Sequence, residues 1–255
     1  MKHIVLLIGF ICLIVNPEIL IAQESDDVDS KLEEASEYLN SGEEEKSLDL
    51  YKNVLKLDEN NESALWNIAI IYAQMGNREE DEESQKEMLE KAMSYADKAL
   101  EHHEESGYAH YSKAVVLARK TDVLDTGDTI EASHEIKKHI ETATEKLPDF
   151  APAWHLFGVW HSDVANVSSA ESTAAGLFSE GLPDADNDKA EEYLKKALDM
   201  DPDVILFNID MARHYLEIDE PEKAKEYFQK VADLEPKMKD DARYQEEAKE
   251  KLKEL

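Results

Sequence analysis

Cysteine is nearly absent from this sequence. Cys12 is the only one among 255 residues, and it lies within an apolar amino-terminal segment. The chain beyond that segment has no thiol, so disulfide bonds cannot stabilise it and a hydrophobic core must do so. Gly9-Phe10-Ile11 precede Cys12, where a lipid-attachment signal would need small residues, so we do not expect lipidation. An exported domain without disulfides is more typical of bacteria than of animals.

Basic residues are also scarce. The chain has 28 Lys and Arg against 59 Asp and Glu, which gives a formal net charge of −31. Lys and Arg form no cluster along the sequence, so we do not expect nucleic acid as a partner. The acidic residues do cluster, for example at 24–29, 43–45 and 79–83. Such clusters usually serve solubility, and a dedicated site for a basic partner is the less favoured interpretation.

No hydrophobic run is long enough to predict a transmembrane helix, which needs roughly 20 apolar residues. Residues 4–15 are apolar, Asn16-Pro17-Glu18 interrupt them, and a short apolar run follows at 19–22. This layout predicts a signal peptide at 1–22, with cleavage near Ala22–Gln23 and a mature domain at 23–255. An uncleaved anchor is the alternative. We therefore expect an exported protein of the periplasm or cell envelope, or a secreted one, with no membrane span after cleavage.

Glycine and proline are rare, at eight and seven residues. Apolar residues recur at intervals of three and four from about Asp29 onward, which predicts helices throughout. The pattern also repeats. It fits tetratricopeptide repeats, which are helical hairpins of about 34 residues with small side chains at positions 8, 20 and 27. Repeats start near 28, 62, 107, 151 and 205, and the small residues are Ala35, Ser47, Ala69, Ala92, Ala99, Ala114, Ala143, Gly158, Ala190, Ala197, Ala212 and Ala224.

Five matches in tandem predict an all-α fold. Because each hairpin leaves an apolar face that only a neighbour can cover, the repeats should stack into a right-handed α-solenoid. The charged segment at 240–255 suits a carboxy-terminal capping helix. Three repeats fit only after insertions, which contain 77–83, 121–128 and 162–188. We expect these insertions to make the array irregular.

The segment around the fourth repeat resembles a known family. Residues 153–160 read Ala-Trp-His-Leu-Phe-Gly-Val-Trp, 173–178 read Thr-Ala-Ala-Gly-Leu-Phe, and an Ala-x-x-Tyr-x-x-Lys-Ala pattern follows at 190–197. Together they resemble the regulator of microtubule dynamics family over roughly 142–255. The resemblance implies a helical repeat fold without a catalytic motif. Animal members associate with microtubules or with mitochondrial and reticulum membranes, but the predicted export route would keep this chain away from cytosolic microtubules.

Two patterns suggest metal sites, and in both a structural interpretation is favoured. Asp184, Asp186 and Asp188 have the opening spacing of a calcium loop, but the glycine and the glutamate that an EF-hand needs later are replaced by Lys189 and Lys195. We predict instead that Asp188 caps the helix that follows. The nine histidines lack the spacing of a shared zinc-ligand face, and His161 falls at an inter-helix packing position. We expect no metal and no cofactor.

The predicted function is therefore non-enzymatic. Phosphate-loop, nucleophile-elbow and Cys–His patterns are missing from the sequence. We expect a scaffold or adaptor of the bacterial periplasm or envelope that binds a protein or peptide partner. The alternative is an envelope hydrolase or metal-dependent enzyme that uses the insertion at 162–188 as a lid. The two differ in whether acidic, His and Ser side chains of that insertion converge on one deep pocket.

The repeat register also predicts where a partner would bind. Positions 5 and 9 of each first helix lie next to the packing positions and should line the concave groove. They form an apolar and aromatic strip that suits an amphipathic helix or an extended peptide, with basic flanks favoured by the acidic rims. An alternative is that these side chains complete the core. The candidate groove residues are Trp66, Ile70, Tyr108, Tyr111, Val115, His155, Val159, Ile209 and Arg213.

Overall fold

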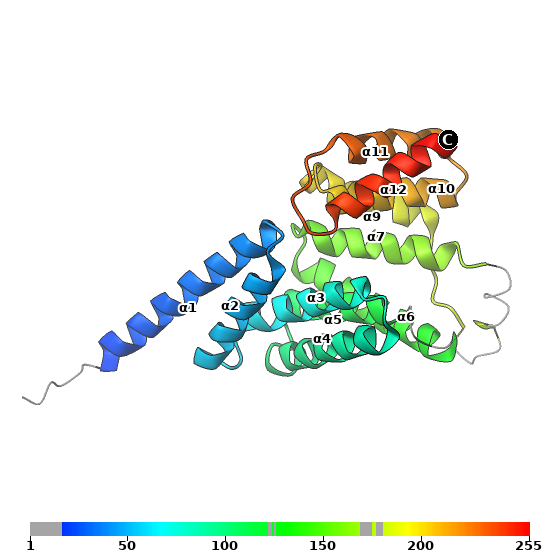
Figure 1. The fold of residues 1–255 in the computed structure, drawn as a ribbon. Coiled ribbons are helices and arrows are strands. Elements are labelled where there is room, and N and C mark those ends of the chain that lie inside the picture. The colour runs from blue at the N-terminus through cyan, green and yellow to red at the C-terminus, as the bar shows by residue number, and fades with distance from the viewer. Residues whose placement is uncertain (1–16, 122–123, 125, 169–174, 177–180) are drawn as a thin grey trace, which may run out of the picture.

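The computed structural model of this chain describes residues 17–121, 124, 126–168, 175–176 and 181–255. Within these ranges all regular structure is helical, which confirms the predicted all-α class. The elements in chain order (Figure 1) are α1 (Pro17–Asn40), α2 (Glu44–Leu57), α3 (Glu62–Arg78), α4 (Glu82–His102), α5 (Gly107–Lys120), α6 (Thr126–Lys146), α7 (Ala151–Ala165), α9 (Asn187–Met200), α10 (Ile205–Glu217), α11 (Pro221–Asp233) and α12 (Asp241–Glu254).

Successive helices pair into five hairpins. They are α1–α2, α3–α4, α5–α6, α7–α9 and α10–α11, and α12 packs on α10 and α11 at the carboxyl end (Figure 1). The last four hairpins begin at Glu62, Gly107, Ala151 and Ile205. This arrangement is a tetratricopeptide-repeat solenoid with a capping helix.

Small side chains allow the paired helices to approach closely. The alanines at the repeat positions, such as Ala35 and Ala190, have 0% exposure. Ser47 is also fully buried, and its hydroxyl donates a hydrogen bond of 2.8 Å to the Ala35 carbonyl on the facing helix. A Cβ atom on Gly158 would lie 2.7 Å from Leu194 Cγ and 2.9 Å from Leu194 N, which is too close for any larger residue. The repeat pattern therefore reflects helix contact distances.

The predicted insertion in the second repeat is mostly helical. Only residues 79–81 separate α3 from α4, and α4 is 21 residues long. The acidic cluster at 79–83 starts this helix because Asp81 accepts a hydrogen bond from Ser84 N at 2.9 Å, and Glu82 and Glu83 then occupy the positive end of the helix dipole. Part of the predicted insertion in the third repeat is likewise helical, since α6 already begins at Thr126.

The helix cap in the fourth repeat is Asp186, and the prediction of Asp188 was wrong. Asp186 Oδ1 accepts hydrogen bonds from Asp188 N at 2.7 Å and from Lys189 N at 3.2 Å. Helix α9 therefore begins two residues before the predicted start, and Asp188 lies in its first turn. Three neighbouring aspartates offered the same capping chemistry, so sequence alone did not distinguish them.

The solenoid closes on itself, because the segment before α12 returns to the first two hairpins. Arg78, at the end of α3, pairs with Asp240 at 2.9 Å and with the buried Glu44 of α2. Lys239 pairs with Glu45 at 2.6 Å. The first and last parts of the array are thus joined directly.

The amino-terminal prediction stays open. Most of the predicted signal peptide lies outside the described residues, and α1 begins at Pro17 and continues through the predicted cleavage site at Ala22–Gln23. No helix in the described ranges has a long enough apolar stretch to cross a membrane. Signal cleavage and export therefore remain predictions.

Candidate functional site

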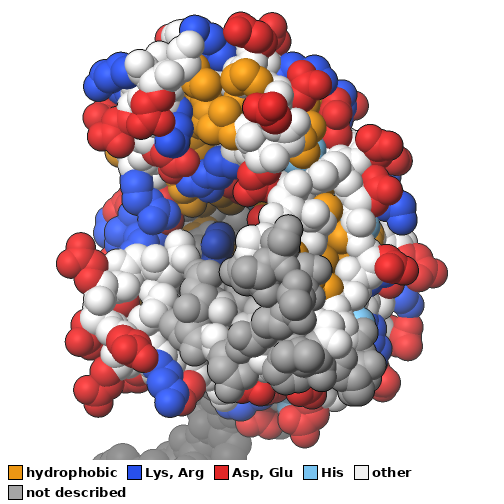
Figure 2. Space-filling view, turned by 90° about the vertical axis from the view of Figure 1, so that its right-hand side faces the viewer, with side chains coloured by type: hydrophobic (Ala, Val, Ile, Leu, Met, Phe, Trp, Pro, Cys, Tyr) orange, Lys and Arg blue, Asp and Glu red, His pale blue; other side chains and the backbone are white. Residues whose placement is uncertain are grey.

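A central cleft lies between the amino-terminal and carboxy-terminal halves of the described chain. It consists of two adjoining cavities of about 370 and about 640 Å³. Their walls come mainly from α3, α5, α7, α10 and α12. Figure 2 shows the hollow, with hydrophobic side chains above it, Lys or Arg side chains within it, and Asp and Glu spread over the outer surface. The residues that line both cavities are Gln74, Asn77, Tyr111, Arg119, His155, Leu206 and Tyr244.

The repeat register brings most of the predicted groove residues to this cleft. The first helix of each inner hairpin turns residues three and four apart toward the same side, so one face of each helix contributes. The predicted residues that line the cleft are Ile70, Tyr111, Val115, His155, Val159 and Arg213. The structure therefore assembles a continuous mixed surface from four helices. Whether a peptide binds there stays a prediction.

Ile209 does not belong to the cleft. It has 0% exposure and lies in the hydrophobic core of the carboxy-terminal half. Helix α10 packs against α7, α9, α11 and α12, so its predicted groove position faces protein. Leu206, Asp210 and Arg213 supply the cleft face of α10 instead.

Trp66 and Tyr108 lie outside the two cavities and contact each other. Their rings stack with centroids 5.2 Å apart, and Phe150 packs edge-on against both. Tyr111 also meets Phe150 edge-on, with ring centroids 5.1 Å apart. Phe150 directly precedes α7, so this aromatic cluster joins the second, third and fourth repeats. At Trp66 and Tyr108 the contacts support the core interpretation of the aromatic strip.

A charged network occupies the carboxy-terminal wall. His155 Nε2 lies 2.9 Å from Asp210 Oδ2, and Arg213 donates to Asp210 Oδ1 at 2.6 Å. Arg213 also donates to Glu247 on α12 at 2.8 Å. Burial raises the pKa of Asp210, but the hydrogen bond from His155 and the positive charges outweigh it and hold that pKa below its usual value. Asp210 is therefore an ionised and internally compensated carboxylate.

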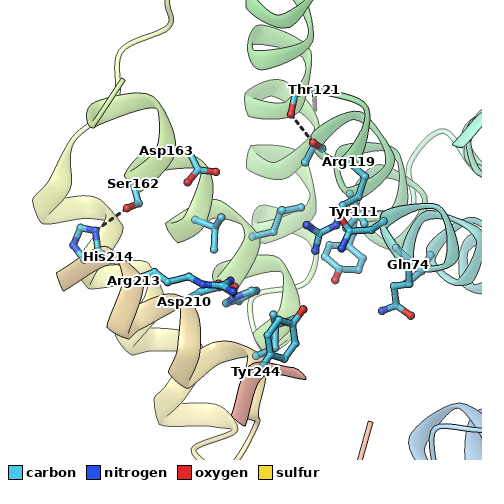
Figure 3. Close-up of a pocket in the computed structure, with 18 of the residues that line it drawn as sticks. Gln74, Tyr111, Arg119, Thr121, Ser162, Asp163, Asp210, Arg213, His214 and Tyr244 are labelled. Atoms are coloured by element: carbon cyan, nitrogen blue, oxygen red, sulfur yellow. Dashed lines mark hydrogen bonds and ion pairs between the residues drawn. The ribbon is translucent and has the colours of Figure 1, made fainter. Parts of the chain in front are cut away.

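A serine and a histidine meet at the end of the same wall. Ser162 Oγ lies 2.8 Å from His214 Nδ1 and donates to Glu217 Oε2 at 2.9 Å (Figure 3). A nucleophilic serine needs a base that a third group orients. Here the carboxylate contacts Ser162, and His214 Nε2 is buried without a hydrogen-bond partner among the described atoms. Burial lowers the pKa of His214, so the neutral ring completes a buried polar contact.

The other histidines form no metal site in the described ranges, where no group of three potential ligands converges. His161 is 2% exposed and packs against Phe157, Trp160 and Tyr193, as its repeat position predicted. His110 and His139 face each other with their Nδ1 atoms 2.8 Å apart. These contacts join helices and do not assemble a reactive centre.

Five residues that line both cavities were not among the predicted groove residues: Gln74, Asn77, Arg119, Leu206 and Tyr244. Arg119 lies four residues after Val115 on α5, so extending the groove pattern by one helical turn would have found it. Leu206 lies three residues before the predicted Ile209, on the adjacent face of α10. Tyr244 lies on the capping helix α12, which packs on α10 and α11 and belongs to none of the five predicted repeats.

Residues 31–255 match the family described as regulator of microtubule dynamics protein 1-3. The chain belongs to this family. Regulator of microtubule dynamics protein 1 of Pongo abelii is 29% identical over 184 residues, which cover 71% of this chain and 58% of that protein. The Mus musculus protein of the same name is 28% identical over 184 residues, covering 71% and 59%. The aligned part thus spans somewhat less than three fifths of these relatives.

Solved structures support the repeat fold of this regulator of microtubule dynamics family member. A tetratricopeptide-repeat protein of Thermus thermophilus superimposes with a TM-score of 0.62 at 17% sequence identity. The superposition covers 87% of this chain and 98% of that one. Identity at this level shows a shared fold, so the cleft's ligand has to be inferred from its own residues.

Proposed function

We propose that this chain is a non-enzymatic interaction scaffold or adaptor that binds an amphipathic helix or an extended peptide of a protein partner in the central cleft. We further propose that it acts after export, in a bacterial periplasm or envelope. The observation that carries the proposal is the cleft itself, because its two walls combine apolar, aromatic and charged side chains from five helices. The names of the curated relatives, which refer to microtubule dynamics, are consistent with protein partners.

The geometry favours binding over catalysis. A hydrolase would need an activated nucleophile and donors for a developing oxyanion. Ser162 lies inside α7, where the backbone N–H groups are used by the helix, and no third group orients His214 in the part of the chain that the structure describes. Much of the insertion proposed as a lid lies outside the described residues. The contact of Ser162, an insertion residue, with His214 and Glu217 of α10 is the one observation that favours an enzyme.

A cleft-filling substitution tests the binding proposal. Leu206 is only partly buried and lines both cavities, so Leu206→Trp should obstruct the cleft without opening a void. Leu57, which is 45% exposed on α2, offers a matched control as Leu57→Trp. Each tagged protein is recovered from a gently solubilised envelope fraction, and bound proteins are quantified by mass spectrometry.

We expect a stoichiometric partner with the parent and with Leu57→Trp, and its loss with Leu206→Trp. Equal recovery with both variants would show that the partner binds elsewhere. Recovery of the tagged parent without a stoichiometric partner would contradict a scaffold. Amino-terminal sequencing of the same material tests export, because cleavage at the predicted site exposes Gln23. A chain that retains Met1 in the cytoplasmic fraction would contradict it.

A further inference from the structure

Arginine is rare in this chain and is concentrated around the central cleft. Only four of the 28 basic residues are arginines. Arg119, Arg213 and Arg243 line the smaller cavity, and Arg78 bridges the closure with Asp240. No lysine lines that cavity in the described ranges. A planar guanidinium can bind a carboxylate through two parallel hydrogen bonds, which a lysine ammonium cannot do. The placement of the arginines therefore favours carboxylate binding in and around the cleft.

Two of the four guanidinium groups are fully engaged within the protein. Arg78 pairs with Glu44 and Asp240. Arg213 pairs with Asp210 and Glu247. Both therefore hold the two halves and the capping helix in place, and neither is available to a ligand.

The other two are less constrained. Arg243 is half exposed and lies 3.5 Å from Asp240 Oδ1, and its guanidinium also rests over the Tyr244 ring. Arg119 forms no hydrogen bond or ion pair within the described ranges, although its side chain is partly buried. A partly buried cation without a counter-charge has lost hydration that a bound anion would replace.

Arg119 occupies the centre of the cleft. It lines both cavities. Burial raises the pKa of both Tyr111 and Tyr244, and the positive charge of Arg119 opposes that rise only in part. Figure 3 shows Arg119 extending from the α5 wall toward the wall that carries Arg213. Of the carboxylates that line the smaller cavity, Asp210 is bound by His155 and Arg213, and Glu217 is bound by Ser162.

We propose that Arg119 binds a carboxylate of an extended peptide whose apolar side chains lie on Val115, Val159 and Leu206. This inference rests on the proposed function and specifies the chemistry of its ligand. The net charge of −31 would repel a polyanion approaching the surface, so the fitting segment carries one carboxylate among apolar residues. Basic residues flanking that segment would still suit the acidic outer surface.

Three pools of acetylated heptapeptides test the inference. All vary Leu, Val, Phe and Tyr around the centre. The first pool has a central Asp and an amidated carboxyl end, the second has Asn there and the same amide, and the third has Asn and a free carboxyl end. Peptides retained by the immobilised chain are quantified by mass spectrometry. Arg119→Gln is compared with Lys120→Gln, because the neighbouring Lys120 lies on the same helix but lines neither cavity.

We expect members of a carboxylate pool to bind about tenfold more tightly than their neutral counterparts, as a charge-assisted hydrogen bond of about 1.4 kcal/mol implies. The difference should vanish in Arg119→Gln, persist in Lys120→Gln and shrink in Arg119→Lys. Preference for the first pool identifies a side-chain carboxylate, and preference for the third a terminal one. In nuclear magnetic resonance spectra of the parent, the side-chain Nε–Hε signal that Arg119→Lys removes should shift on binding.

Equal binding of charged and neutral pools would overturn the role of Arg119 while leaving peptide binding in the cleft intact. An equal loss of the preference for carboxylate peptides in Lys120→Gln would also overturn the role of Arg119, because the net charge of the protein would then explain that preference. Failure of all three pools to bind would contradict the binding of an extended peptide in the cleft as well. Thermal melting of each variant shows whether a loss of binding reflects unfolding, and Arg119→Lys keeps the charge if Arg119→Gln is unstable.

Discussion

The buried histidines show how the surroundings of a side chain determine its protonation in this fold. His139 and His161 both have a pKa lowered to about 4. Burial is the larger cause in each case, followed by the facing His110 for His139 and by Lys189 for His161. Neither ring meets a set of metal ligands in the described ranges, so both are neutral packing residues at neutral pH.

These two histidines predict an acid-labile fold. Because their folded pKa lies below the unfolded value, the unfolded chain binds more protons between about pH 6.5 and pH 4, and stability falls as pH falls through that window. Replacing both with Gln should remove about 2 kcal/mol of that loss per histidine, which urea unfolding at pH 7 and pH 4.5 would measure. His102 is exposed, so His102→Gln is the control. The carboxylates titrate alike in the parent, the double variant and the control. If the double variant loses as much stability between pH 7 and pH 4.5 as the parent, the two histidines are not the cause of the acid lability.

At the scale of the element, the repeat pattern predicted most of the fold. Helix starts such as Gly107 and Ala151 could be found because close helix contacts restrict certain positions to small residues. The course of the insertions could not be found, because acidic residues such as Glu82 serve equally well in a loop or in the first turn of a helix. Six of the predicted groove residues line the cleft, whereas Trp66 and Tyr108 pack in an aromatic cluster and Ile209 is buried in the core of the carboxy-terminal half. Whether the cleft is a peptide groove stays a prediction.

The capping aspartate of α9 gives a prediction about the stability of that helix. Asp186→Ala should lower the free energy of unfolding by about 1 kcal/mol, because two backbone N–H groups lose their acceptor. Asp188→Ala should cost less, about 0.3–1 kcal/mol, because only its charge near the helix start is lost. Urea unfolding of both variants compares them directly. A larger loss for Asp188→Ala would restore the cap predicted from the sequence.

For the whole molecule, the closure of the solenoid determines the shape of the cleft. Arg78 and Asp240 are separated by 162 residues in sequence. No local pattern could have indicated that they meet, because a repeat describes only the contacts between neighbouring hairpins. The cleft residues on α12 were therefore not predicted from the sequence, whereas Tyr111 and Val115 on α5 and His155 and Val159 on α7 were.

Removing the bridge at Arg78 should open the molecule. Arg78→Gln leaves Glu44, which is 3% exposed, without its main partner and breaks the link to Asp240. We expect a larger radius of gyration by small-angle X-ray scattering and a loss of about 2 kcal/mol in stability. Lys249→Gln, which breaks an exposed pair with Glu246, should change neither. Equal scattering curves for Arg78→Gln and the parent would show that packing alone maintains the closure.

The closure also restricts how many hairpins this protein can contain. An open solenoid can gain or lose a hairpin at either end, because each unit contacts only its neighbours. Here one additional hairpin would move α12 by roughly 10 Å, the usual spacing of packed helices, and Asp240 would no longer reach Arg78. The number of hairpins and the shape of the cleft are therefore linked. Duplication of a repeat would break the contact between Arg78 and Asp240 and would produce a different binding surface.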